Sequence, residues 1–227
     1  MNWQDEGYLI SKRKFRENAI IINVFTSKRG KVSGIVYGGN SRKIRNYLQI
    51  SNKIFAIYNS KNENNLGYFK TELIEPYAPK YFGDKIKTAT LLSFSSLLNS
   101  LLPDLQPHKK IYESLNVFFN SLKSENWLLT YVIWELNLIK ELGYGIDLSV
   151  YTKKINVNSD FSNLKIDNTK YLVPNYLITN ENENKILNNE TIKKSLIFTR
   201  SLMLNKFFMP NNIIFPKSRI LLENYFS

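Results

Sequence analysis

The residues of this chain that could do chemistry are mainly basic, and they gather near its start. Between Asn18 and Asn62 there are eight Lys or Arg residues and no Asp or Glu. Residues 1–60 hold eleven basic and three acidic residues, which is +8 of the chain's net charge of +12. Lys, Asn and Ile are used heavily along the whole chain, and a coding bias of that kind would spread the charge evenly. Because the charge is clustered instead, the sequence predicts a surface that binds a polyanion.

Three groups of cations are the candidates for contacts with phosphates. They are Lys12, Arg13, Lys14 and Arg16 at the end of a strand, Lys28, Arg29 and Lys31 around a glycine turn, and Arg42, Lys43 and Arg45 after Gly38-Gly39. Tyr47 lies beside the third group, so we expect it to stack on an unpaired base. Tyr37, Phe55 and Tyr58 are aromatic residues of the same segment that could stack or fill a core. Each basic group could also be an ordinary solvated turn.

Other reactive residue types are scarce. The chain has no cysteine, which excludes disulfides and thiolate zinc sites, and its single histidine, His108, gives a metal site or a Ser/His pair little to build on. Gly38-Gly39 lacks the following Lys-Ser/Thr of a nucleotide-binding loop, so a corner with positive φ is expected there. Asp5 and Glu6 are adjacent on a strand and face opposite sides. We therefore expect no catalytic residue, no metal and no cofactor.

The elements that must position these residues are short strands followed by helices. Strand-like stretches cover 3–15, 19–26, 31–37, 53–59 and 66–74, with a basic loop at 40–47. Five short strands within about 75 residues, with glycine corners, predict a small closed barrel of the oligonucleotide-binding (OB) type.

Beyond the strands the period of the apolar residues changes to that of helices. Helices are predicted at 83–102, 107–123 and 126–142, and again at 191–208 and 217–225. Glu135 lies on the third and most apolar helix. It could be a buried acid, but pairing with a Lys or Arg, or exposure on the one polar stripe, is the expectation. The stretch 150–190 is rich in Asn, Lys and Asp and is read as a poorly ordered or hairpin-containing insertion, with 180–189 as its most loop-like part.

The fold class is therefore α+β, an N-terminal five-stranded OB barrel followed by an all-α bundle with an irregular, cysteine-free insertion. We divide the chain into an OB domain (1–78), a helical bundle (79–149), the insertion (150–190) and helices that return to the bundle (191–227). No apolar run approaches the roughly 20 residues that cross a bilayer, and no signal peptide is visible, so a cytoplasmic location is expected.

Four segments, in order along the chain, resemble the RecO family of bacterial recombination and repair proteins. They are Trp3–Ser11, Gly34–Gln49 with its Gly38-Gly39-X-Ser41-Arg42 core, Pro107–Leu115 and Trp134–Leu148. The resemblance covers roughly residues 1–149, and the final helices show a weaker similarity to the family.

The resemblance implies an OB barrel, a helical bundle and a cytoplasmic, nucleoid-associated protein that binds single- and double-stranded DNA. It also implies annealing of complementary strands and work with RecR to load RecA on DNA coated by single-strand-binding protein (SSB). Many members of the family carry a cysteine zinc finger after the bundle. Where those cysteines are expected, this chain reads Leu148–Thr152 without one, so zinc is excluded by the lack of ligands.

Two other functions stay open from the residues alone. The chain could be an adaptor whose basic barrel binds an acidic partner, such as the tail of SSB, instead of DNA. An enzyme such as a nuclease or transferase is the weaker alternative, because no metal-ligand cluster, nucleophile–base pair or nucleotide loop stands out.

Overall fold

The computed structural model describes residues 1–61, 66–179 and 187–226 of the chain. Its contacts group these residues into two compact units, and two of the three boundaries between the units fall within helices. The first unit comprises Met1–Glu113 and Pro216–Leu222, and the second comprises 114–215 and 223–227. The four-part division expected from the sequence stays a prediction.

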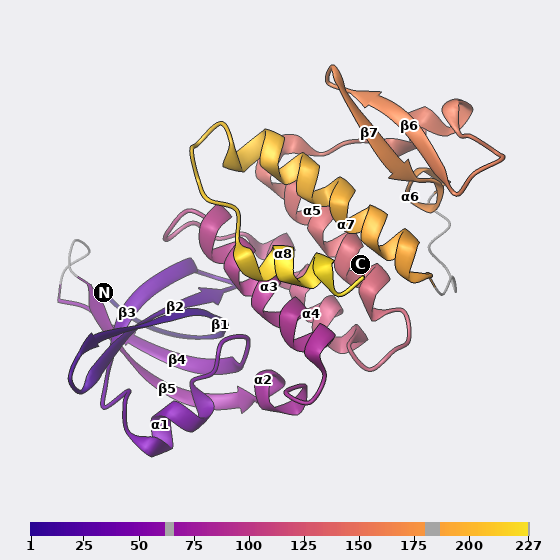
Figure 1. Cartoon of the computed structure of the whole chain (residues 1–227). Coiled ribbons are helices and arrows are strands. Elements are labelled where there is room, and N and C mark those ends of the chain that lie inside the picture. Colours follow the sequence, from indigo (N-terminus) through magenta and orange to yellow (C-terminus); the bar gives the residue numbers. More distant parts are fainter. Residues whose placement is uncertain (62–65, 180–186, 227) are drawn as a thin grey trace. The chain divides into compact units, whose positions relative to one another are not determined.

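The first unit is built on a closed five-stranded barrel in the order β1-β2-β3-β5-β4, in which β4 pairs back with β1. Its strands are β1 (Asn2–Arg16), β2 (Ala19–Thr26), β3 (Gly30–Tyr37), β4 (Lys53–Asn59) and β5 (Gly67–Glu75). Four of the pairings are antiparallel, and β3 and β5 pair in parallel (Figure 1). This is the barrel of the OB type that the sequence predicts, and each strand lies within two residues of its expected bounds.

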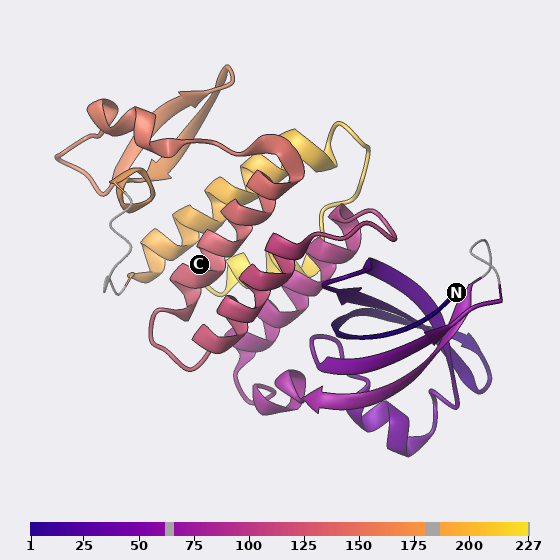
Figure 2. The ribbon, with the colours of Figure 1, turned by 180° about the vertical axis from the view of Figure 1, so that it is seen from behind.

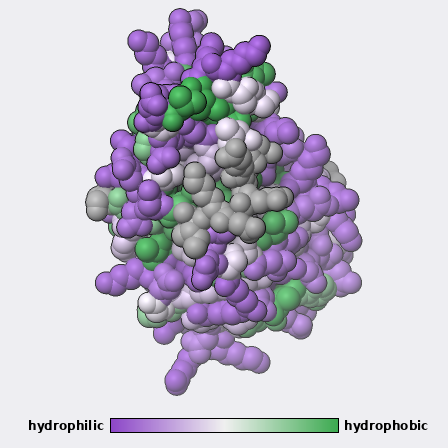
Figure 3. Space-filling view, turned by 90° about the vertical axis from the view of Figure 1, so that its right-hand side faces the viewer, coloured by the Kyte–Doolittle hydropathy of each residue, from purple (hydrophilic) through white to green (hydrophobic). Residues whose placement is uncertain are grey.

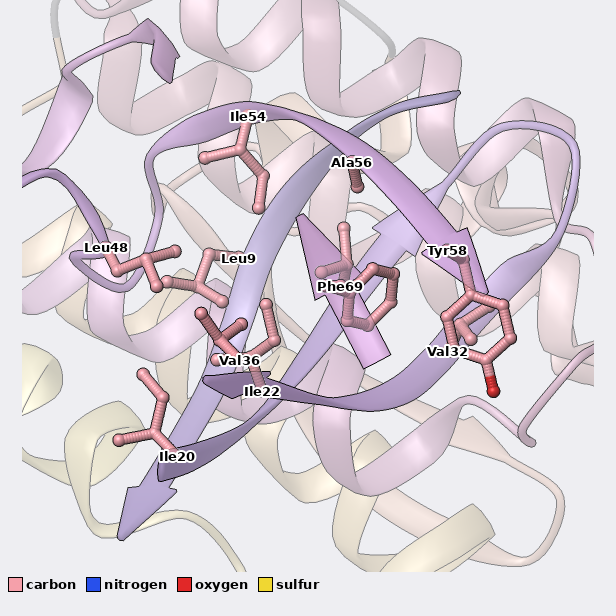
Figure 4. Close-up of a cluster of buried hydrophobic side chains, with 11 residues drawn as sticks. Leu9, Ile20, Ile22, Val32, Val36, Leu48, Ile54, Ala56, Tyr58 and Phe69 are labelled. Atoms are coloured by element: carbon pink, nitrogen blue, oxygen red, sulfur yellow. The ribbon is translucent and has the colours of Figure 1, made fainter. Parts of the chain in front are cut away.

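The barrel is closed around a core of alternating apolar side chains. The cluster comprises Leu9, Ile20, Ile22, Val24, Val32, Val36, Leu48, Ile54, Ala56, Tyr58 and Phe69 (Figure 4). The ring of Trp3 packs against this core and stacks on Tyr58 with ring centroids 5.1 Å apart. Gly34 is required because a Cβ there would lie 2.6 Å from the ring of Phe69. The core fixes which residues of each strand face outward.

The predicted basic loop at 40–47 is wrong in part, because Arg42–Tyr47 form the helix α1 (Figure 1). Ser41 is the N-cap residue, and its hydroxyl accepts a hydrogen bond from the backbone N–H of Ile44. Ile44 and Tyr47 share one face of the helix and pack against the barrel core. Gly38 has a φ of +67°, so the predicted glycine corner before this helix is confirmed.

The helices of the first unit are α2 (Tyr77–Lys80), α3 (Lys85–Leu101), the start of α4 (Lys109–Ser121) and most of α8 (Lys217–Asn224). α3 lies against the outside of the barrel. Its Asn99 side chain accepts a hydrogen bond from the amide of Asn23 on β2 at 2.7 Å, and Ser51 donates to the carbonyl of Leu91 at 2.9 Å. The outer side of β2 is therefore closed, with Ile21 5% and Phe25 0% exposed.

The second unit is helical, with a small hairpin. Its elements are α5 (Trp127–Ile139), the π-helical turn η1 (Lys140–Tyr144), the 3₁₀-helix η2 (Leu148–Lys154), β6 (Phe161–Ile166), β7 (Thr169–Pro174), α6 (Asn175–Thr179), α7 (Asn189–Met203) and the π-helical turn η3 (Leu204–Phe208). Gly143, with a φ of +95°, lies inside η1, which follows α5 directly. The insertion is a two-stranded hairpin packed on α7 (Figure 2). Its two-residue turn, Asp167-Asn168, has positive φ at both positions. The loop expected at 180–189 lies largely outside the described residues.

Glu135 corrects one sequence expectation, because it is fully buried on α5 and not exposed on a polar stripe. One of its carboxylate oxygens accepts a hydrogen bond from the hydroxyl of Thr199 on α7. In the part of the chain that the structure describes, no helix is long and apolar enough to cross a membrane. Hydrophilic side chains predominate on the face in Figure 3, and the hydrophobic ones form small separate groups.

Candidate nucleic-acid interface

Two of the three predicted basic groups lie together at one end of the barrel. We call them the cationic rim: Lys12, Arg13, Lys14, Arg16, Arg42, Lys43 and Arg45. The β1–β2 turn is held against the segment before α1 by two hydrogen bonds. The N–H of Gly38 donates to the carbonyl of Asn18 at 2.8 Å, and the Asn40 amide donates to the carbonyl of Glu17 at 2.7 Å. These bonds bring a strand end and a helix that are about 30 residues apart in the sequence to one place.

A cavity of about 230 Å³ opens between these two elements. It is lined by Lys12, Arg13, Lys14, Ile20, Gly39, Asn40, Arg45 and Leu48. Four of these residues are basic, and none of the described residues that line the cavity is acidic. Glu17, in the exposed β1–β2 turn, is the nearest acid in the sequence. The cavity is therefore a small, positively charged recess that suits an anionic group such as a phosphate.

Lys12 is the most enclosed cation of the rim. Its ammonium donates to the carbonyl of Leu48 at 2.8 Å and to the side-chain oxygen of Gln49 at 3.3 Å. Burial, and then the nearby charge of Arg45, lower the pKa of Lys12 below that of a free lysine. A phosphate placed beside Lys12 and Arg45 would offset their mutual repulsion.

The third predicted group lies at the other end of β2, around the β2–β3 turn. Seven residue steps along β2 separate the two ends by roughly 24 Å. The Lys31 ammonium forms an ion pair with Asp104 at 3.2 Å and donates to the carbonyl of Asn99 at 3.0 Å, and its side chain is 12% exposed. The N–H of Lys28 donates to the carboxylate of Asp5 at 3.3 Å. Carboxylates thus accompany this group, and it does not continue the cationic rim.

Tyr47 is held in place by contacts with the barrel itself. Its hydroxyl donates to the carbonyl of Thr71 on β5 at 2.7 Å, and its ring packs against the barrel core. These contacts account for Tyr47 without a bound base. We therefore leave Tyr47 and Lys31 out of the interface proposed below.

The structure instead exposes Tyr37, which the sequence left open between stacking and core packing, and Tyr68, which the sequence analysis did not name. Tyr37 at the end of β3 is 61% exposed, and Tyr68 at the start of β5 is 40% exposed. Their ring centroids lie 6.3 Å apart. The signal in the sequence is the alternation of β3, since Tyr37 directly follows the inward-facing Val36 and must face outward. The position of Tyr68 beside it depends on the parallel β3–β5 pairing, which the sequence alone does not give.

OB barrels commonly bind oligonucleotides on the face of strands 2 and 3. In this chain α3 and α4 close the part of that face made by β2, where Phe25 contacts Tyr112 with ring centroids 5.8 Å apart. The cationic rim and the tyrosine pair lie beyond the closed part, at the β1–β2 turn and the end of β3. The described residues include no group of three His, Cys, Asp or Glu side chains that could hold a metal ion.

The model of the recombination protein O N-terminal domain matches residues 1–77, and that of the recombination protein O C-terminal domain matches residues 83–162. This chain belongs to the RecO family. The resemblance found in the sequence over residues 1–149 is thereby confirmed.

Curated RecO relatives agree with this assignment. DNA repair protein RecO of Wolbachia sp. subsp. Drosophila simulans is 36% identical over 151 residues, which is 66% of this chain and 62% of the relative. The proteins of the same name from Ehrlichia chaffeensis and Ruegeria sp. are 37% and 35% identical, over 61% and 62% of their own lengths. The chain thus spans about 62% of the length of these relatives.

Among solved structures, asparaginyl-tRNA synthetase of Entamoeba histolytica is 14% identical to this RecO-family chain, covering 76% of it and 39% of the synthetase. The TM-score of 0.30 is too low to establish a shared fold.

Proposed function

We propose that this RecO-family chain is a non-enzymatic DNA-binding mediator of recombinational repair that holds single- and double-stranded DNA at the cationic rim. The observation that carries the proposal is the recess between the β1–β2 turn and α1, where four basic side chains line one cavity. Cations grouped without intervening acids attract a phosphate backbone irrespective of its sequence. Each phosphate contact also releases condensed counterions, so the affinity should fall steeply with salt.

Annealing follows from the same electrostatics. Two complementary strands repel each other through their phosphates, and cations that neutralise both backbones lower this repulsion. The rim extends over a strand end and a helix, so it offers more cations than a single phosphate needs. We propose that this surplus lets the chain hold two strands near each other.

The partners in the proposal come from the family resemblance. The chain would work with RecR to load RecA on DNA coated by SSB, in the cytoplasm and in association with the nucleoid.

The net charges of the two units support different roles for them. The first unit has twenty Lys/Arg against nine Asp/Glu, net +11, and the second has eleven against ten, net +1. DNA contacts are therefore proposed for the first unit.

A second candidate function is an adaptor that binds an acidic protein tail. An apolar cavity of about 530 Å³ in the first unit favours it, because Lys12 lines this cavity as well as the basic recess. Its apolar wall includes Phe82, which is 82% exposed, and Leu92, which is 38% exposed. A tail with carboxylates and a terminal apolar side chain would match this combination.

Binding assays with purified chain separate the two candidates. Fluorescence anisotropy with a labelled single strand and a labelled duplex should show binding of both, and annealing of two complementary labelled strands should be faster with the chain than without it. The variant Arg42→Ala/Lys43→Ala/Arg45→Ala should lose most of both activities. If the wild type binds neither DNA but retains an acidic peptide, the adaptor is the correct function.

A further inference from the structure

We propose that Tyr37 and Tyr68 form a stacking platform for unpaired nucleobases, so that the chain binds single strands through their bases as well as their phosphates. This inference rests on the proposed function, because the platform acts on a strand whose phosphates the cationic rim holds. It adds a second class of ligand group, the exposed faces of unpaired bases, which a duplex does not present along its length.

The two rings are placed where a base could reach them. Phe69 and Val36 face into the barrel core, so their neighbours Tyr68 and Tyr37 face outward. The rings are tilted by 54° at 6.3 Å between centroids, so they do not cover each other face to face. Among the residues that the structure describes, neither phenol hydroxyl has a hydrogen-bond partner.

Three other aromatic rings of the barrel pack against its core, while Phe15 on β1 is 41% exposed and lies 5.2 Å from the guanidinium of Arg16. Trp3, Tyr58 and Phe69 contact one another around the core, with centroids 5.0 to 6.0 Å apart. Tyr37 and Tyr68 instead present two neighbouring aromatic rings to solvent. A base that stacks on such a ring gains contact area without any requirement for a particular sequence.

The platform is adjacent to cations of the rim. Tyr37 pairs in register with Ala19 on β2, which pairs with Arg16 on β1, so the three residues share the outer face of the sheet. Two strand spacings put the backbones of Arg16 and Tyr37 roughly 10 Å apart. Lys70, two residues after Tyr68 on β5, faces the same side and is exposed. Cations therefore flank the pair of rings on both sides.

The matched substitutions are Tyr37→Leu and Tyr68→Leu, which keep an apolar side chain in a strand and remove the ring. Stacking is worth about a factor of ten per base, so each variant should bind a single strand about tenfold more weakly. Tyr37→Phe and Tyr68→Phe keep the ring and should bind like the wild type. Tyr144→Leu, at a 45% exposed tyrosine of the second unit, is the control and should also bind like the wild type.

The probes are a labelled single strand, a duplex of the same length and an abasic strand that has phosphates and sugars but no bases. The Leu variants should lose affinity for the single strand alone and bind the duplex and the abasic strand like the wild type. Equal losses on all three probes, or no loss on the single strand, would overturn the stacking platform. If the wild type binds none of the probes, the proposed function fails together with this inference. Salt-dependent binding to all three probes that the Leu substitutions leave unchanged refutes the platform alone.

Discussion

The two ends of the barrel both carry cations, seven at the β1–β2 end and three at the β2–β3 end, but they differ in how many carboxylates accompany them. At the β1–β2 end, Lys12, Lys14 and Arg45 share a recess without an acidic side chain among its described lining residues. At the β2–β3 end, Lys31 is paired with Asp104, and Asp5 holds the backbone of Lys28. The two ends therefore differ in the placement of their carboxylates as well as in their number of basic residues.

The largest expected effect is a difference between the two ends in DNA binding. Arg42→Ala/Lys43→Ala/Arg45→Ala should lower the slope of log affinity against log salt by about 2 for a single strand, because each phosphate contact contributes about 0.7. Lys28→Ala/Arg29→Ala, which removes two cations at the other end, should leave the slope nearly unchanged, whereas two lost phosphate contacts would lower it by about 1.4. Anisotropy titrations at several salt concentrations measure both. Similar losses from both variants would mean that the ends do not differ.

A gain of binding at the β2–β3 end would sharpen the comparison. Asp104→Asn removes the carboxylate that pairs with Lys31. The variant should bind a single strand slightly more tightly, with a slope steeper by at most about 0.7, because one cation at most is released. The same titration measures it, with Glu113→Gln, an exposed acid that pairs with Lys109, as the control. A weaker affinity in Asp104→Asn would show that the ion pair supports binding instead of suppressing it.

The stability of α1, the helix that carries three of the seven rim cations, should depend on its N-cap residue. Ser41→Ala removes the hydroxyl that accepts from the N–H of Ile44 and should cost about 0.5–1 kcal/mol of unfolding free energy, measured by urea denaturation. DNA affinity should fall by less than in the triple variant, because the cations remain. Ser41→Asp keeps a capping oxygen and should restore the stability. A loss of stability in Ser41→Asp equal to that in Ser41→Ala would contradict the capping role.

The smallest effect concerns the pH dependence of binding. The pKa of Lys12 is lowered by burial, so its charge is lost at a lower pH than that of an ordinary lysine. DNA affinity should therefore decline as the pH rises through this lowered value, while Lys12→Arg, which stays charged, should bind over a wider alkaline range. Identical pH profiles for the two proteins would show that Lys12 is not part of the interface.

Local patterns in the sequence predicted most of the barrel. The strands were found because apolar residues alternate and turn residues punctuate them, and Gly38 was recognised as a corner from its type. The helix α1 was missed because six residues are too short for a clear period, although Ser41 followed by Ile44 and Tyr47 gives a capping and i,i+3 signal.

The site was less predictable because it depends on contacts between distant parts of the chain. Nothing near Lys31 in the sequence shows that Asp104 and α3 will neutralise it. Tyr47 and Tyr37 differ for the same kind of reason, since the barrel core takes one ring and leaves the other in solvent. The sequence thus predicted which residue types bind DNA, but which of these residues lie together could be seen only in the folded structure.

Crosslinking from defined positions tests most directly whether DNA lies at the cationic rim. The chain has no cysteine, so Asn46→Cys on α1 and Ser27→Cys at the β2–β3 end each create a unique site for a thiol-linked photocrosslinker. With a labelled single strand, position 46 should crosslink efficiently and position 27 only weakly, and excess unlabelled strand should abolish the signal. Crosslinking from position 27 equal to or stronger than that from position 46 would contradict the account.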